Sequence, residues 1–212
     1  MKYKAIREEE LKNKVGGDWF NAFDTTEIVG NIDFCVLPKQ DSLFGRTPLL
    51  WAEAKTGNYD VATMFVQLIL TIGKARTFDK TLPPAFLGAF DFKKIAFVPY
   101  VSIQDIFYLN DFDWTVTSSN HSTKEFALIK GRIEAILASD THHYDFEKDE
   151  KELSFFIKNN IAKATEAGND ENKRKKLVIY INLPFKRGWE SRIRSRIKTK
   201  WEPLKRARSI TI

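Results

Sequence analysis

Three charged residues inside apolar stretches are the strongest candidates for chemistry in this sequence. Asp33 lies in NIDFCVL, whereas Glu53 and Lys55 lie in LLWAEAK. Burying a carboxylate or an ammonium group costs several kcal/mol unless the charge is paired or used, so charges in these strand-like stretches need a reason. In a β-strand, residues i and i+2 point to the same face, which places Glu53 and Lys55 side by side.

Together these side chains suit metal-dependent chemistry on a phosphate ester. If the strands around Asp33 and Glu53 pair in a suitable register, their carboxylates meet on one face near Lys55. Two carboxylates can hold Mg²⁺, which keeps several waters and binds phosphate oxygens. Lys55 can orient or deprotonate an attacking water and stabilise the charge that develops at phosphorus.

Two alternatives stay open for these residues. Asp41 is a rival for the first acid, although it lies in a predicted turn, where acidic residues are common at the surface. The pair formed by Glu53 and Lys55 also fits a partly exposed edge strand, on which it is a surface ion pair worth less than about 1 kcal/mol.

The elements that must position these residues follow from turn signals and apolar periodicity. Gly16 and Gly17 predict the end of the first helix, and Asn58 or Asp60 is expected to cap the helix that follows the second strand. The predicted elements are a helix over 3–15, strands over 27–37 and 49–55, a helix over 61–76, strands over 93–103 and 113–118, helices over 123–139 and 148–164, and a strand over 177–183. This order predicts an α/β sandwich around a mixed sheet.

The pattern of Asp33, the tripeptide Glu53-Ala54-Lys55 and Gln67 on the next helix resembles the PD-(D/E)xK nuclease superfamily over roughly residues 1–105. The resemblance implies an αβββαβ restriction-endonuclease-like fold, here with additional C-terminal helices. It also implies hydrolysis of DNA with Mg²⁺, for which Mn²⁺ can substitute. Asp33 and Glu53 would bind the metal, and Lys55 and Gln67 would complete the catalytic set. One departure is that Ile32, rather than the proline of the motif, precedes Asp33.

An acid on the first helix can join the site in this superfamily. Glu8, Glu9 and Glu10 are all candidates, and the sequence does not choose among them. The chain looks most like the N-terminal cleavage domain of fused, type IIG-like restriction–modification enzymes. That likeness implies a fused or separate methyltransferase or specificity domain as a partner, and a homodimer for double-strand cleavage. The alternative from another class is a non-catalytic nucleic-acid-binding module with a nuclease-like fold.

The charge distribution also favours a polyanionic partner. Residues 173–208 contain 14 Lys or Arg and 2 acidic residues, so the rest of a chain with net charge +6 is acidic overall. We therefore expect a nuclease-like domain over 1–188 and a basic, helical tail or linker over 189–212. The candidate DNA-binding residues are Lys74, Arg76, Arg192, Arg194, Arg196 and Lys198.

Composition excludes several other classes of protein. No apolar run approaches the roughly 20 residues that a membrane helix needs, and the first residues have no signal-peptide core. A single cysteine excludes an intrachain disulfide, and 3 histidines with 1 cysteine argue against a Cys/His zinc site. These features predict a cytoplasmic protein without a membrane segment.

Overall fold

A mixed β-sheet forms the centre of the protein in a computed structural model, which describes residues 2–3, 6–40 and 46–167. The described strands, in both chain and sheet order, are β1 (Phe34–Val36), β2 (Leu50–Ala54), β3 (Phe86–Phe90), β4 (Lys94–Pro99) and β5 (His142–Asp145). β2 and β3 are parallel, and the other neighbouring pairs are antiparallel. The predicted α/β class and mixed sheet are thus confirmed.

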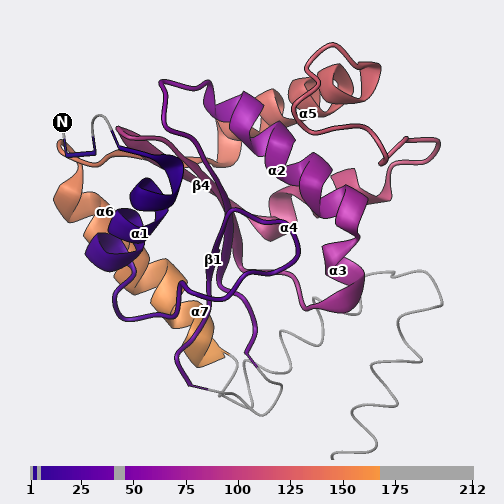
Figure 1. The fold of residues 1–212 in the computed structure, drawn as a ribbon. Helices are drawn as coiled ribbons and strands as arrows, with labels where there is room; N and C mark the ends of the chain where they lie inside the picture. Colours follow the sequence, from indigo (N-terminus) through magenta and orange to yellow (C-terminus); the bar gives the residue numbers. More distant parts are fainter. Residues whose placement is uncertain (1, 4–5, 41–45, 168–212) are drawn as a thin grey trace, which may run out of the picture. The chain divides into compact units, whose positions relative to one another are not determined.

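Helices cover both faces of this sheet (Figure 1). One layer contains α1 (Glu8–Trp19), α6 (Glu150–Phe156) and α7 (Ala162–Ala167), the last two joined by a π-helical turn over Ile157–Ile161. The other layer contains α2 (Val61–Ala75), α3 (Thr77–Lys80), α4 (Tyr100–Ile103) with the 3₁₀ turn Gln104–Tyr108, and α5 (Lys124–Asp140). Side chains alternate along β2, so that Trp51 packs under α2 whereas Ala52 and Ala54 pack under α1. The two small residues let α1 approach the strand closely.

Both ends of α2 lie within one residue of the predicted 61–76 helix. The Asp60 carboxylate accepts a hydrogen bond from the Thr63 backbone N–H at 3.2 Å and so caps the first turn. The helix ends at Arg76, whose φ of 48° is left-handed. Residues 62–70 are all buried, because the sheet covers one side of the helix and α5 covers the other.

The first helix runs through the glycines that were expected to end it. α1 continues to Trp19, and a Cβ on Gly16 would lie only 2.8 Å from Thr25 Oγ1. Gly16 therefore permits close packing inside the helix rather than ending it.

The strands depart from the predicted αβββαβ order. Between α1 and α2 the described residues form two strands and the isolated bridge of Asp24 with Leu37, where three strands were expected. Asp33 lies in a bend immediately before β1, which is much shorter than the predicted 27–37 strand. Pairing with β2 begins only at Phe34.

Later elements differ as well. β3 and β5 were not predicted, and β4 ends at Pro99, where the chain turns into α4 instead of continuing to 103. Residues 113–118 form turns rather than a strand. The predicted 177–183 strand and the boundary at 188 lie outside the described residues. Among the helices that are described, none is long and apolar enough to cross a membrane.

Candidate active site

Three carboxylates surround the ammonium group of Lys55, just beyond the end of β2. Lys55 Nζ lies 2.7 Å from Glu53 Oε1 and 3.6 Å from Asp33 Oδ2. The third acid is Glu8, whose Oε2 is 3.8 Å from the same nitrogen. We call these four residues the Lys55 cluster. The structure thus brings together both predicted metal ligands, the predicted lysine and one of the first-helix acids.

The pairing of β1 with β2 explains how the first two carboxylates meet. Phe34 is aligned with Ala52 in this antiparallel pair, so one step further Asp33 comes opposite Glu53. Asp33 Oδ2 also accepts a long, 3.5 Å hydrogen bond from the Ala54 backbone N–H. The expected juxtaposition is therefore found, although Asp33 lies next to the strand rather than inside it.

α1 supplies a single acid to the cluster. Glu8 is the first residue of the helix, and the helix is held against the sheet by buried Leu11 and Val15. Glu9 and Glu10 instead form ion pairs along the helix surface, with Lys12 and with Lys14 respectively. Of the three candidates only Glu8 therefore reaches Lys55.

Burial and mutual repulsion set the electrostatics of the Lys55 cluster. The Glu53 residue is only 7% exposed, and burial, together with the charges of Asp33 and Glu8, raises its pKa to about 7 despite the bond to Lys55. Burial alone would lower the pKa of Lys55, but the hydrogen bond that it donates to Glu53 and the three negative charges outweigh burial and raise that pKa. Three carboxylates against one ammonium group leave an excess of negative charge.

The surroundings of Glu53 rule out the edge-strand alternative. β2 lies between β1 and β3, and Lys55 extends the parallel pairing by donating its backbone N–H to Phe90 O at 3.0 Å. A buried carboxylate on an interior strand is not a surface ion pair. The rival acid Asp41 lies outside the described residues.

The cluster fits a hard divalent cation by its donor atoms and by its excess of negative charge. Mg²⁺ usually takes one or two protein carboxylates and keeps several waters. Asp33 and Glu53 can supply those two ligands, and Glu8 is near enough to accept a hydrogen bond from a bound water. Across the described ranges, no group of three or more His, Cys, Asp or Glu side chains is arranged to hold a metal ion. The donor set thus fits a cation held by two carboxylates, with water completing its coordination, rather than an all-protein cage.

Among the described residues, no hydrogen bond joins Gln67 to the Lys55 cluster. Gln67 is 7% exposed on α2, and its Nε2 lies 3.0 Å from His121 Nε2. Its Oε1 is buried without a hydrogen-bond partner among the described protein groups. His121 in turn stacks on Phe126, the rings being 4.5 Å apart. A single histidine in a polar loop gives no signal in the sequence, so this contact could not be anticipated.

The candidate DNA-binding residues receive little support from their surroundings. Lys74 is exposed near the end of α2. Arg76 is engaged locally, because its Nε lies 2.5 Å from Asp79 Oδ2 and its guanidinium group lies over the Phe78 ring. The remaining candidates, Arg192, Arg194, Arg196 and Lys198, lie outside the described residues.

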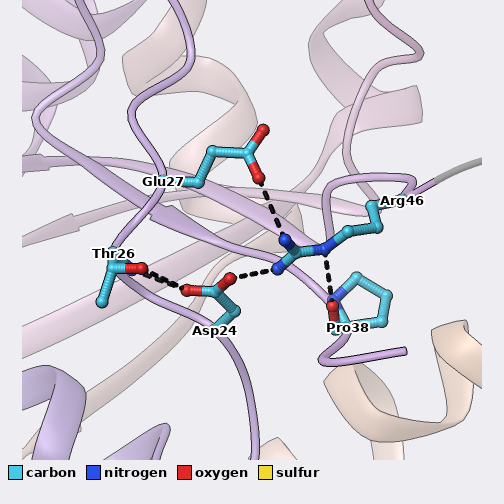
Figure 2. A network of polar contacts seen from close by, with 5 residues as sticks. All are labelled: Asp24, Thr26, Glu27, Pro38 and Arg46. Atoms are coloured by element: carbon cyan, nitrogen blue, oxygen red, sulfur yellow. Dashed lines mark hydrogen bonds and ion pairs between the residues drawn. The ribbon is translucent and has the colours of Figure 1, made fainter. Parts of the chain in front are cut away.

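A second group of charges surrounds Arg46, as Figure 2 shows. Its guanidinium donates to Pro38 O at 2.9 Å, to Glu27 Oε2 at 3.2 Å and to Asp24 Oδ2. Asp24 also accepts from the Thr26 backbone N–H at 2.9 Å and from its hydroxyl at 2.7 Å. These bonds, above all the one to Arg46, lower the pKa of Asp24 to about 2. We call Asp24, Thr26, Glu27 and Arg46 the Arg46 cluster.

The chain was also compared with known proteins, and no protein-family model, curated protein or solved structure matches it.

Proposed function

We propose that this protein is a Mg²⁺-dependent nuclease that hydrolyses DNA phosphodiesters. The observation that carries the proposal is the convergence of Asp33, Glu53 and Glu8 on the Lys55 ammonium group. Such a set of hard oxygen ligands beside a lysine suits hydrolysis of a phosphate ester. The resemblance to PD-(D/E)xK nucleases supports the same reaction class.

Each residue of the cluster would have its own role in this reaction. Asp33 and Glu53 would hold Mg²⁺, which would supply charge stabilisation at the phosphate oxygens. Lys55 would orient the attacking water and stabilise the negative charge that develops as the new P–O bond forms. Glu8 would accept a hydrogen bond from a water in the site. The superfamily resemblance implies that the P–O3′ bond breaks, which leaves a 5′-phosphate and a 3′-hydroxyl.

DNA is the preferred substrate because of the charge distribution along the chain. The body of the protein is acidic, and the 14 basic residues within 173–208 offer sequence-independent contacts to phosphates. Such a basic segment would add affinity for a polyanion to a protein whose metal site is acidic. A cleavage module of a restriction–modification enzyme combines these features.

A cleavage assay with matched variants tests the proposal. Plasmid and linear DNA are incubated with the full chain and Mg²⁺ or Mn²⁺, over a range of protein concentrations that detects dependence on a dimer. We expect cleavage by the wild type and by Glu10→Ala, which removes an exposed acid of the same helix, and none by Asp33→Ala or Lys55→Ala. Wild-type rates in both site variants would overturn the assignment.

Binding measurements separate the proposed nuclease from a non-catalytic module. Mn²⁺ binding, followed by titration calorimetry, should be weakened by Asp33→Ala and left unchanged by Glu10→Ala. DNA binding that survives every substitution, without cleavage or metal binding by the wild type, would instead favour the non-catalytic nucleic-acid-binding module.

A further inference from the structure

A row of alternating charges crosses the sheet next to the Lys55 cluster. The Lys55 backbone N–H bonds to Phe90 O, which brings Lys55 alongside Asp91 at the end of β3. Asp91 in turn donates its backbone N–H to Lys94 O at 3.0 Å, where β4 begins. Lys55 and Asp91 therefore directly follow β2 and β3, and Lys94 begins β4, the next strand in the sheet; we call these three residues the outer row.

The outer row projects from the same sheet face as Glu53. In the strand register Glu53 is aligned with Ala89, and Ala89 is aligned with Ala96. Both alanines are buried in the apolar cluster beneath α2. Each member of the outer row lies two positions further toward this edge, and residues i and i+2 share a face. Lys94 and Lys55 thus point to one side of the sheet.

A fully buried carboxylate holds the Lys94 ammonium group. Asp91 is 0% exposed, and its Oδ1 accepts backbone hydrogen bonds from Lys93 at 2.8 Å and from Lys94 at 3.0 Å. Its Oδ2 has no hydrogen-bond partner among the described groups and lies 3.7 Å from Lys94 Nζ. This separation is an ion pair rather than a hydrogen bond, so the N–H donors of Lys94 remain available to another acceptor.

Lys93, the residue before Lys94, differs from it in exposure and in its ion-pair partner. The side chain of Lys93 is 45% exposed, whereas that of Lys94 is 22% exposed. Lys93 Nζ pairs with Asp145 Oδ2 at 3.9 Å, and the side chain of Asp145 is 18% exposed. Lys93 lies in the bend before β4 rather than on the strand. Lys93 is therefore a matched control for Lys94.

We propose that Lys94 binds a DNA phosphate close to the one hydrolysed at the Lys55 cluster. Two strand spacings separate Lys94 from Lys55, about 10 Å between the backbones. Along the helix axis of DNA, where each strand rises about 3.4 Å per phosphate, that separation corresponds to about three base-pair steps. The inference rests on the proposed function, because it takes DNA as the substrate.

The test uses the dependence of DNA affinity on salt. Replacing Lys94 alone leaves a buried charge unpaired and threatens the fold, so the substitutions are made in an Asp91→Asn background. Asparagine keeps the Oδ1 acceptor for the two backbone N–H groups but carries no charge. Binding of a duplex oligonucleotide to the full chain is measured in EDTA, where hydrolysis is blocked, over a series of NaCl concentrations.

We expect Lys94→Gln in that background to lower the slope of log K against log salt by about 0.9 and to weaken binding about 8-fold at 0.1 M salt. Lys93→Gln in the same background should leave the slope and the affinity nearly unchanged. Equal slopes for the two lysine variants would overturn the inference, even if the wild type cleaves DNA. A difference between them in a chain that never cleaves DNA would support Lys94 as a phosphate contact and refute the proposed hydrolysis.

Discussion

Two groups of charges in this protein place one cation among acidic side chains, and the pKa of one acid in each group shifts, in opposite directions. In the Arg46 cluster the pKa of Asp24 falls to about 2. In the Lys55 cluster the pKa of Glu53 rises to about 7. Burial differs between them, since the side chain of Asp24 is 23% exposed and that of Glu53 is 10% exposed.

The geometry of the two cations completes the contrast. Arg46 offers a planar fork, and its donors satisfy two carboxylates and a backbone carbonyl at once. Lys55 is a point charge among three carboxylates, of which only Glu53 comes within hydrogen-bonding distance. In the Arg46 cluster one cation faces two acids and donates a hydrogen bond to each, whereas in the Lys55 cluster one cation faces three acids and leaves the larger negative charge for a second cation to neutralise. We therefore expect the first to stabilise the fold and the second to serve the reaction.

The largest expected effect is on catalysis. Lys55→Met should reduce DNA cleavage by about 100-fold or more, because it removes a charge that acts on the transition state. Arg46→Met should leave the turnover of the folded fraction nearly unchanged. The two variants are compared by their single-turnover cleavage rates with Mg²⁺, each corrected for the folded fraction measured by circular dichroism. Similar losses in both variants would abolish the distinction between the clusters.

The next effect is on stability. Arg46→Ala should lower the free energy of unfolding by about 2 kcal/mol, because charge-assisted hydrogen bonds that tie residues 24–27 to the connection after β1 are lost. Arg46→Lys should recover less than half of this loss, since an ammonium group cannot reproduce the fork. Urea denaturation measures both variants. Full recovery by lysine would mean that charge alone, rather than geometry, holds this cluster.

A third prediction separates the acids of α1. Glu8→Gln should weaken Mn²⁺ binding and lower cleavage by about 10-fold, in the range found when a group that orients metal ligands is lost. Glu10→Gln should change neither by more than about 2-fold, because its exposed pair with Lys14 contributes little. Equal effects of the two substitutions would remove Glu8 from the site.

The Lys55 cluster could be anticipated largely because local patterns determine it. Strand alternation places Glu53 beside Lys55, and an antiparallel connection brings Asp33 opposite Glu53. The choice of Glu8 depends on how α1 docks on the sheet, and a run of three glutamates does not encode that. Gln67 was expected from resemblance alone, and its direction is set by the packing of α2 against α5 and His121.

The fold was predicted in class but not in detail. β3 contains Gly88, which weakens a strand pattern, yet a Cβ there would lie 3.0 Å from a Leu50 methyl group and 3.3 Å from Ala96 O, so the glycine relieves crowding between neighbouring strands. The predicted end of the first helix at Gly16 was wrong for a related reason, because this glycine permits close contact with Thr25 inside α1. The Arg46 cluster joins residues 22 positions apart, and no local pattern predicts such a contact.

The smallest expected effect is the loss, at low pH, of the stability that the Arg46 cluster contributes to the fold. The pKa of Asp24 lies near 2 in the folded protein, below its ordinary value of 3.8, so folding favours its ionised form. The resulting stabilisation is complete above about pH 4 and is lost as the pH falls toward 2. Because Asp24 is partly exposed, we expect this contribution to be about 1 kcal/mol.

Asp24→Asn isolates that contribution. Urea denaturation between pH 2 and pH 6 should show the variant less stable than the wild type at pH 6, with the two curves converging as the pH approaches 2. Asp113→Asn is the matched control, because Asp113 also accepts hydrogen bonds from a following threonine but has no arginine partner among the described residues. If the control converges with the wild type to the same extent, the threonine bonds rather than the Arg46 guanidinium account for the acid dependence.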